Sequence, residues 1–167
     1  MLDKRLLECA AQTLDQCQEA GQMVATVESC TGGLITASLT EIAGSSAVVE
    51  AGFVTYSNES KTRLVGVPVK LLENFGAVSK PVAIAMAEGA LAHSGASISV
   101  SVTGVAGPGG GSKEKPVGTV HMACARSGFE TRHELKNYGD LGRSEIRVRT
   151  VLDALVLLQA CLKVPAA

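Results

Sequence analysis

Short apolar segments typical of buried strands alternate with helix-patterned segments along the first hundred residues of this chain. Strands are predicted over residues 23–27, 48–56 and 98–103, with helix-patterned residues between each pair. Strands that are joined through helices lie parallel in one sheet, and the helices cover both faces of that sheet. The alternation therefore predicts an α/β fold.

The helical segments are recognised by apolar residues that recur three and four positions apart. Leu2, Leu6, Cys9 and Thr13 form such a face, and Gly21 ends the first helix. The polar and then mixed residues 57–66 receive no assignment. The pattern predicts helices over residues 2–20, 34–42, 68–75, 80–93 and 141–162.

The last two predicted strands, over residues 117–125 and 129–135, are separated only by Arg126-Ser127-Gly128. Such a short connection favours an antiparallel hairpin. We therefore expect a three-layer α/β/α sandwich with a mixed, mostly parallel sheet and a terminal antiparallel hairpin. Repeats and linker-like segments are not apparent, so residues 1–167 are expected to form a single domain.

The composition restricts the partners that we expect. The chain has 15 Lys and Arg against 16 Asp and Glu, and aromatic residues make up only 3%. Nucleic-acid binders use basic stripes and aromatic platforms, and membranes require a polybasic patch or an apolar run of about 20 residues. The N-terminal segment also lacks the apolar core of a secretory signal. We expect no nucleic acid, no membrane and a cytoplasmic location.

The cysteines and histidines follow no metal-binding pattern. Five cysteines make an odd number and none belongs to a C-x-x-C pair, while the three histidines are scattered singly. Reduced thiols fit a cytoplasmic protein. We therefore expect neither a metal nor another cofactor.

Polar segments follow the first three predicted strands, at residues 28–33, 55–61 and 104–115. Ligands of parallel sheets bind beyond the carboxyl ends of the strands, so the three segments are expected to form one site. The first segment places Ser29 at a strand-to-helix turn. There Ser29 is either a nucleophile beside free backbone N–H groups or, like Thr31, a helix cap.

Lys61 ends the second polar segment and has two interpretations. With no histidine near a candidate serine, a Ser-His-Asp triad has no evident base. A lysine whose pKa is lowered by burial can replace the histidine. A solvated surface lysine is the commoner case when only the spacing is considered.

The third polar segment and the last helix each have two interpretations, and one of these is anion binding. Lys113 follows a serine rather than a glycine, which excludes a Walker A loop. The glycines of residues 104–115 form either a backbone nest for an anion or a flexible loop. Arg143 and Arg147 open the last helix, where the helix dipole disfavours arginine. They either bind an anion or form a solvated face with Glu145.

Three longer segments, in the same order along the chain, closely resemble the CinA C-terminal domain family: ESCTGGLITASLTEIAGSSAVVEAGFVTYSNESK, GAVS and SVTGVAGPGGGSKEKPVGTV. The resemblance runs from about residue 5 to residue 160. The family includes amidases of nicotinamide mononucleotide. The resemblance therefore implies hydrolysis of that nucleotide to nicotinate mononucleotide and ammonia, with the nucleotide as a small-molecule partner.

The resemblance also implies roles for individual residues. Ser29 is the implied nucleophile, Lys61 its base and Tyr56 a supporting catalytic residue. Arg143 and Arg147 align with the family arginines across a two-residue insertion. Together with the residue chemistry, the resemblance assigns oxyanion or substrate binding to Cys30, Thr31, Gly32, Gly33, Thr103, Gly104, Gly107, Gly110, Arg143 and Arg147.

Other functions stay open on the sequence alone. A non-catalytic relative would use the same residues to bind a nucleotide or a protein, and another small amide would suit the same chemistry. Cys30 is a rival nucleophile because it adjoins Ser29. The Leu- and Ala-rich helix faces favour self-association, so we expect a homo-oligomer.

Overall fold

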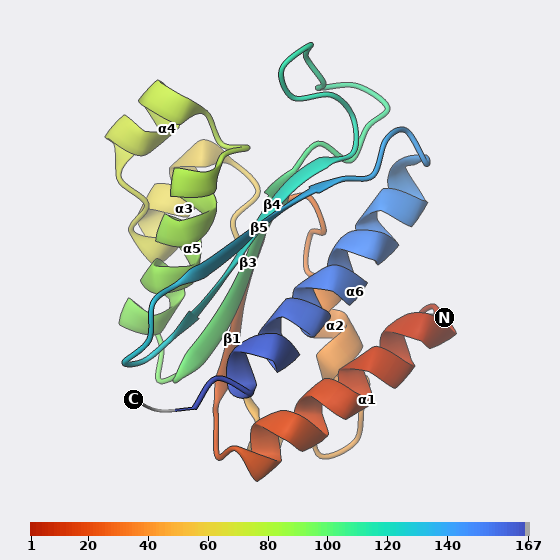
Figure 1. Ribbon diagram of the computed structural model, residues 1–167, viewed down its shortest axis with the longest axis vertical. Coiled ribbons are helices and arrows are strands. Elements are labelled where there is room, and N and C mark those ends of the chain that lie inside the picture. Colours follow the sequence, from red (N-terminus) through yellow and green to blue (C-terminus); the bar gives the residue numbers. More distant parts are fainter. Residues whose placement is uncertain (166–167) are drawn as a thin grey trace.

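A computed structural model describes residues 1–165 and contains a five-stranded sheet with helices on both faces (Figure 1). The strands are β1 (Val24–Glu28), β2 (Val49–Val54), β3 (Ile98–Gly104), β4 (Thr119–Arg126) and β5 (Arg132–Asn137). The helices are α1 (Lys4–Glu19), α2 (Leu34–Thr40), α3 (Asn58–Val65), α4 (Val69–Phe75), α5 (Lys80–Ala92) and α6 (Arg143–Leu162), with a 3-10 turn η1 (Ser45–Ala47) before β2.

The sheet is mixed, with the strand order β2-β1-β3-β4-β5. Strand β1 is parallel to both β2 and β3. Strand β4 is antiparallel to β3, and β5 is antiparallel to β4. The predicted fold class, a mostly parallel core that ends in an antiparallel hairpin, is confirmed. Because β1, β2 and β3 run in one direction, their carboxyl ends meet at one edge of the sheet.

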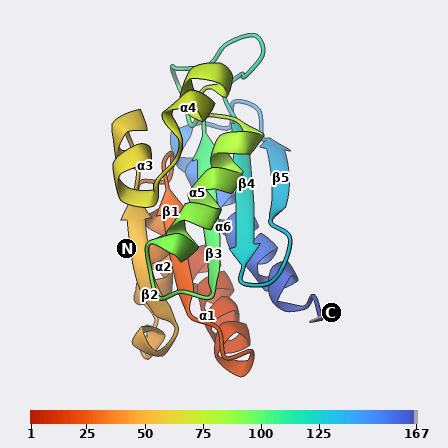
Figure 2. The same ribbon diagram turned by 90° about the vertical axis from the view of Figure 1, so that its left-hand side faces the viewer.

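Two aliphatic cores hold the layers together. Helices α1, α2 and α6 cover one face of the sheet, and α3, α4 and α5 cover the other (Figures 1 and 2). Val100 and Leu155 are fully buried in the first core, as are Val27 and Met86 in the second. Burying each such side chain stabilises the fold by about 1.5–3 kcal/mol. Within residues 1–165, none of the helices has the length and apolar character needed to cross a membrane.

Helix α3 is the element that the sequence pattern missed. It begins with a capping box, in which Ser57 Oγ accepts a hydrogen bond from the Ser60 N–H at 3.0 Å and Ser60 Oγ accepts one from the Ser57 N–H at 3.1 Å. The second position of this motif is usually Glu or Gln, so a serine there gives a weak signal. The cap fixes the first turn of α3 and with it Lys61, which lies on the buried face of the helix.

The second strand of the terminal hairpin begins later than the sequence pattern predicts. Strand β5 begins at Arg132, whereas the pattern places the start at Phe129. The Phe129 ring instead lies in the turn, where the Arg126 guanidinium sits 4.2 Å from the ring centroid. A cation over an aromatic face is favourable, so Phe129 packs against the turn rather than in the sheet.

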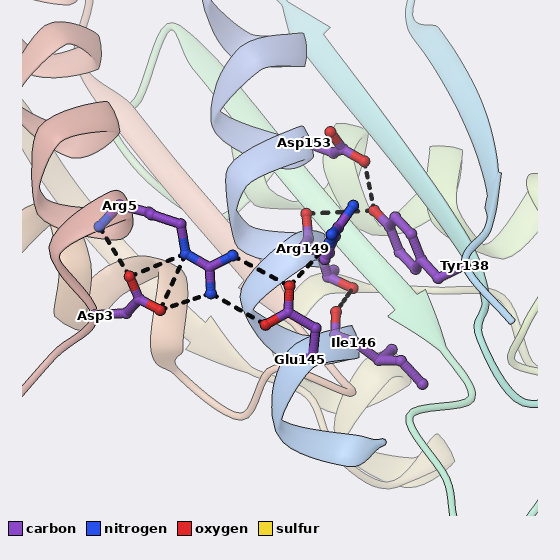
Figure 3. Close-up of polar contacts among 8 residues, drawn as sticks. Asp3, Arg5, Tyr138, Glu145, Ile146, Arg149 and Asp153 are labelled. Atoms are coloured by element: carbon purple, nitrogen blue, oxygen red, sulfur yellow. Dashed lines mark hydrogen bonds and ion pairs between the residues drawn. The ribbon is translucent and has the colours of Figure 1, made fainter. Parts of the chain in front are cut away.

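Polar contacts link the start of α6 to the start of α1 (Figure 3). Arg5 at the beginning of α1 donates to both carboxylate oxygens of Glu145, at 3.1 and 3.0 Å, and Arg149 donates to the same carboxylate at 2.9 Å. These hydrogen bonds lower the pKa of Glu145 to about 2, and those from Arg5 have the largest effect. Exposed ion pairs stabilise folds only weakly. They add to the aliphatic packing of α1 against α6, which places the first turn of α6.

Gly89 of α5 packs against the end of α3. A Cβ at this position would overlap the Val65 carbonyl oxygen. We expect Gly89→Ala to lower the free energy of unfolding by about 1–3 kcal/mol, as overpacking does. Gly109→Ala, with no atom within 4 Å of the added Cβ, is the matched control. Chemical denaturation measures both variants. A Gly89→Ala protein as stable as the wild type would contradict the close packing of α3 on α5.

Candidate active site

The three polar segments meet at the carboxyl edge of β1, β2 and β3, as the sequence predicts. They line a cavity of about 270 Å³ together with the start of α6. Nine of the residues singled out from the sequence lie in its wall: Ser29, Cys30, Tyr56, Lys61, Thr103, Gly104, Gly107, Gly110 and Arg143. Thr31, Gly32, Gly33 and Arg147 lie outside the lining residues. The structure therefore brings nine of these thirteen residues together in one cavity and places the other four outside its lining.

Ser29 and Lys61 form the central contact of this cavity. The Lys61 Nζ donates to Ser29 Oγ at 3.1 Å and to the Thr55 carbonyl at 2.8 Å. The Lys61 side chain is only 1% exposed, so it is not the solvated lysine that spacing alone would favour. Burial lowers the pKa of Lys61 and outweighs the opposing effects of Cys30 and Glu59. Among residues 1–165, no carboxylate forms a salt bridge with it.

Glu28 has a role that the sequence analysis did not assign. It is the last residue of β1, is fully buried, and accepts hydrogen bonds from the N–H groups of Gly33, Ile35 and Thr36 at 3.1, 2.9 and 2.8 Å. It thus takes the place of a helix cap for α2, and neither Ser29 nor Thr31 fills that role. The available signal was an acidic residue just before a helix start, where a negative charge is favourable.

The two predicted arginines lie in different places. Arg143 Nη1 donates to the Gly107 carbonyl at 2.8 Å, and its Nη2 donates to the Tyr56 hydroxyl at 3.2 Å. Arg143 therefore joins three segments at the cavity wall. Arg147 Nη2 instead donates to the Thr31 carbonyl at 2.6 Å, behind the serine turn. Arg143 therefore lies at the cavity wall, whereas Arg147 contacts the backbone of the serine turn from outside the lining residues.

The Gly-rich segment forms the loop between β3 and β4 and is anchored at two points along its length. Lys115 Nζ donates to the Phe75 carbonyl at 2.7 Å, while Arg143 holds the Gly107 carbonyl. Gly107 and Gly110 have φ values of +78° and +83°, which favour glycine. The anchored loop agrees better with a shaped wall than with a freely flexible segment.

Cys30 is poorly suited to act as the nucleophile. Its side chain is almost entirely buried, and this burial raises the pKa of the thiol to about 12. The reactive form of cysteine is the thiolate, which is scarce at neutral pH under these conditions.

Asn58 at the start of α3 also lines the cavity and was not singled out from the sequence. Within the described chain, no three His, Cys, Asp or Glu side chains form a metal-binding group.

The fold and the site define a class: a three-layer α/β protein with a buried lysine hydrogen-bonded to a serine at the carboxyl edge of its parallel strands. The family model described as the CinA C-terminal domain matches residues 6–162. This chain belongs to the CinA C-terminal domain family, which confirms the resemblance found in its motifs.

Several relatives support this membership. A CinA-like protein of Akkermansia muciniphila is 57% identical over 114 residues, which cover 68% of this chain and 28% of that protein. A CinA-like protein of Colwellia psychrerythraea is 56% identical over 114 residues, which cover 68% of this chain and 26% of that protein. The chain thus spans less than a third of the length of these two curated relatives.

Solved structures match over nearly their whole length. The competence/damage inducible protein CihA from Agrobacterium tumefaciens is 50% identical with a TM-score of 0.94, covering 98% of this chain and 99% of that one. A competence-damaged protein (CinA) superfamily protein from Escherichia coli is 27% identical with a TM-score of 0.88, covering 98% and 94%.

The lowered pKa of Lys61 predicts a pH-dependent stability. In the window between its folded pKa and its ordinary value of 10.5, the unfolded chain binds more protons at this lysine than the folded chain does. The free energy of unfolding should therefore rise with pH through this window. Lys61→Met should lose that rise, whereas Lys70→Met, at an exposed lysine, should keep it. Denaturation at several pH values measures it. Parallel pH curves for wild type and Lys61→Met would contradict the lowered pKa.

Proposed function

We propose that this chain acts as one amidase domain that hydrolyses the carboxamide of nicotinamide mononucleotide through a serine–lysine acyl-enzyme mechanism. The observation that carries the proposal is the 3.1 Å contact between Ser29 Oγ and the buried Nζ of Lys61. A serine hydroxyl is a weak nucleophile until a neighbouring base accepts its proton. Burial supplies such a base by favouring the neutral amine.

The first half of the reaction forms the acyl-enzyme. Neutral Lys61 accepts the proton of the Ser29 hydroxyl as the oxygen attacks the carboxamide carbon. The negative charge that develops on the carboxamide oxygen is held by backbone N–H groups of the turn after Ser29. The loss of one such donor typically costs about 3 kcal/mol of transition-state stabilisation.

The second half releases the two products. The Lys61 ammonium donates a proton to the amine of the tetrahedral intermediate, either directly or through the Tyr56 hydroxyl, which gives up its own proton and regains one from Lys61. The amine leaves as ammonia, and Lys61 is neutral again. Water then attacks the ester carbon and gives its proton to Lys61, so nicotinate mononucleotide leaves and Ser29 regains its hydroxyl. The balance needs only water as co-reactant, and no cofactor takes part in the proposed steps.

The charges of the cavity support a phosphorylated substrate. Arg143 stays cationic while Lys61 is in its neutral form, and no Asp or Glu lies among the described lining residues. Arginine suits phosphate because it donates two parallel hydrogen bonds. We place the carboxamide at Ser29 and the ribose phosphate towards Arg143 and the Gly-rich loop. Arg147 then supports the serine turn instead of contacting substrate.

The cellular setting belongs to the same proposal. All five cysteines are free thiols, which suits the reducing cytoplasm. Exposed apolar side chains such as Val156 of α6 favour association with a second copy of the chain. We therefore propose a cytoplasmic homo-oligomer.

Ammonia release from nicotinamide mononucleotide tests the proposal. We expect Ser29→Ala to lower kcat by at least about 10³-fold, because the nucleophile is lost. Cys30→Ser removes only the thiol and keeps the backbone N–H, so most of the turnover should remain. Nucleotide binding is measured in parallel by calorimetry.

Three outcomes would contradict this account. Retained turnover in Ser29→Ala would remove Ser29 from its role, and lost turnover in Cys30→Ser alone would transfer that role to the thiol. A wild-type protein that binds the nucleotide without releasing ammonia would favour a binding module.

A further inference from the structure

The carboxylate of Glu28 lies directly before the turn that carries Ser29. Glu28 Oε2 accepts hydrogen bonds from Thr31 Oγ1 at 2.6 Å and from the N–H groups of Gly33 and Ile35 at 3.1 and 2.9 Å. Its Oε1 accepts bonds from the N–H and the hydroxyl of Thr36, at 2.8 and 3.0 Å. A fully buried carboxylate is therefore fixed by five donors that all follow Ser29 in the chain.

These bonds decide which backbone N–H groups remain free near Ser29. The Ser29 N–H donates to the Val102 carbonyl at 3.1 Å, and the Gly32 N–H closes a turn on the Ser29 carbonyl at 3.1 Å. The Leu34 N–H donates to the Thr31 carbonyl at 3.3 Å. The Glu28 carboxylate accepts hydrogen bonds from three further N–H groups, those of Gly33, Ile35 and Thr36.

Only two N–H groups between Ser29 and Thr36 are then left without an acceptor in another residue of the described chain, those of Cys30 and Thr31. They are the two central residues of the turn, whose closing hydrogen bond involves neither of their N–H groups. Cys30 also lines the cavity. The start of α2 therefore offers the substrate no further donors, and the oxyanion must be held by the turn itself.

Arg147 fixes the same turn from the opposite side. Its Nη2 donates to the Thr31 carbonyl at 2.6 Å, while Thr31 Oγ1 donates to Glu28. Helix α6 thus holds the Thr31 carbonyl through Arg147, and strand β1 holds the Thr31 side chain through Glu28. Two anchors of opposite charge, both outside the cavity lining, leave the turn little freedom to rotate.

We propose that Glu28 is a positioning residue for the reaction assigned to Ser29: it binds the amides of α2 and sets the turn so that the N–H groups of Cys30 and Thr31 face the developing oxyanion. This inference rests on the proposed function of Ser29. Glu28 does not touch the substrate, and it acts only through the backbone that it holds.

Glu28→Gln tests the proposal because it keeps the size of the side chain and removes one acceptor. An amide presents a single oxygen, so its NH₂ group must face either the Thr36 N–H or the N–H groups of Gly33 and Ile35. At least one backbone donor loses its partner in either orientation. The turn should shift, and misplacement of catalytic groups by about 1 Å costs about 10²-fold in rate.

The experiment measures ammonia release from nicotinamide mononucleotide by the Glu28→Gln variant. The matched control is Glu50→Gln, at an exposed position of β2. We expect kcat to fall about 10²-fold in Glu28→Gln with KM near the wild-type value, because the lost interaction acts in the transition state. Glu50→Gln should match the wild type. A Glu28→Gln enzyme with wild-type kcat, or one in which only KM rises, would overturn the proposal.

A second readout does not depend on the substrate. The rate at which a fluorophosphonate labels Ser29 is measured by mass spectrometry in the same proteins. If the wild type is labelled but releases no ammonia from the nucleotide, the proposed substrate is wrong and the labelling rate decides the role of Glu28. Slower labelling in Glu28→Gln supports the role, and an equal rate overturns it. A wild type that shows neither reaction overturns both proposals.

A third variant covers loss of folding, which is checked by thermal unfolding. Thr31→Val removes the 2.6 Å bond from Thr31 Oγ1 to Glu28 and leaves the bonds from Gly33, Ile35 and Thr36 in place. We expect kcat to fall in the same direction but by less. If Glu28→Gln does not fold, an unchanged kcat in Thr31→Val overturns the proposal.

Discussion

A single buried amine, Lys61 Nζ, is the constraint on which the account of this site depends. It has a serine oxygen and a carbonyl oxygen as hydrogen-bond partners, and no carboxylate neutralises it within residues 1–165. A charged ammonium in such surroundings is costly, so the neutral form is favoured. The same burial that would destabilise the fold if the lysine stayed charged favours the neutral amine that the proposed mechanism uses as the base for Ser29.

The fold creates this environment through the way in which its parallel strands end. Strands β1, β2 and β3 carry three chemically different segments to one edge of the sheet, and α6 closes that edge with Arg143. Lys61 reaches this edge because the capping box starts α3 only a few residues after the end of β2. Buried aliphatic side chains pack on both faces of the sheet. This packing holds the strand ends, and the polar groups that follow them, in fixed relative positions.

The sequence predicted the sheet and the meeting of the three polar segments at one edge of it, because both follow from patterns that are local in the chain. Alternating strand and helix segments determine the parallel core, and the polar stretches after the strands mark the edge at which the candidate site lies. The role of Glu28 could not be read in this way, since a carboxylate with five donors is a property of the folded turn. The division between Arg143 at the cavity and Arg147 behind the turn likewise depends on the direction of α6, which is set by contacts with α1 that are distant in sequence.

The most direct test of the central claim is a nuclear magnetic resonance titration of isotope-labelled lysine side chains, with Lys61→Met used to assign the signal. The account predicts that Lys61 Nζ titrates below its ordinary pKa of 10.5, so that a larger fraction of neutral amine is present at a given pH than for exposed lysines. A Lys61 signal that titrates at or above 10.5 would contradict the account, because the serine would then face an ammonium instead of a base.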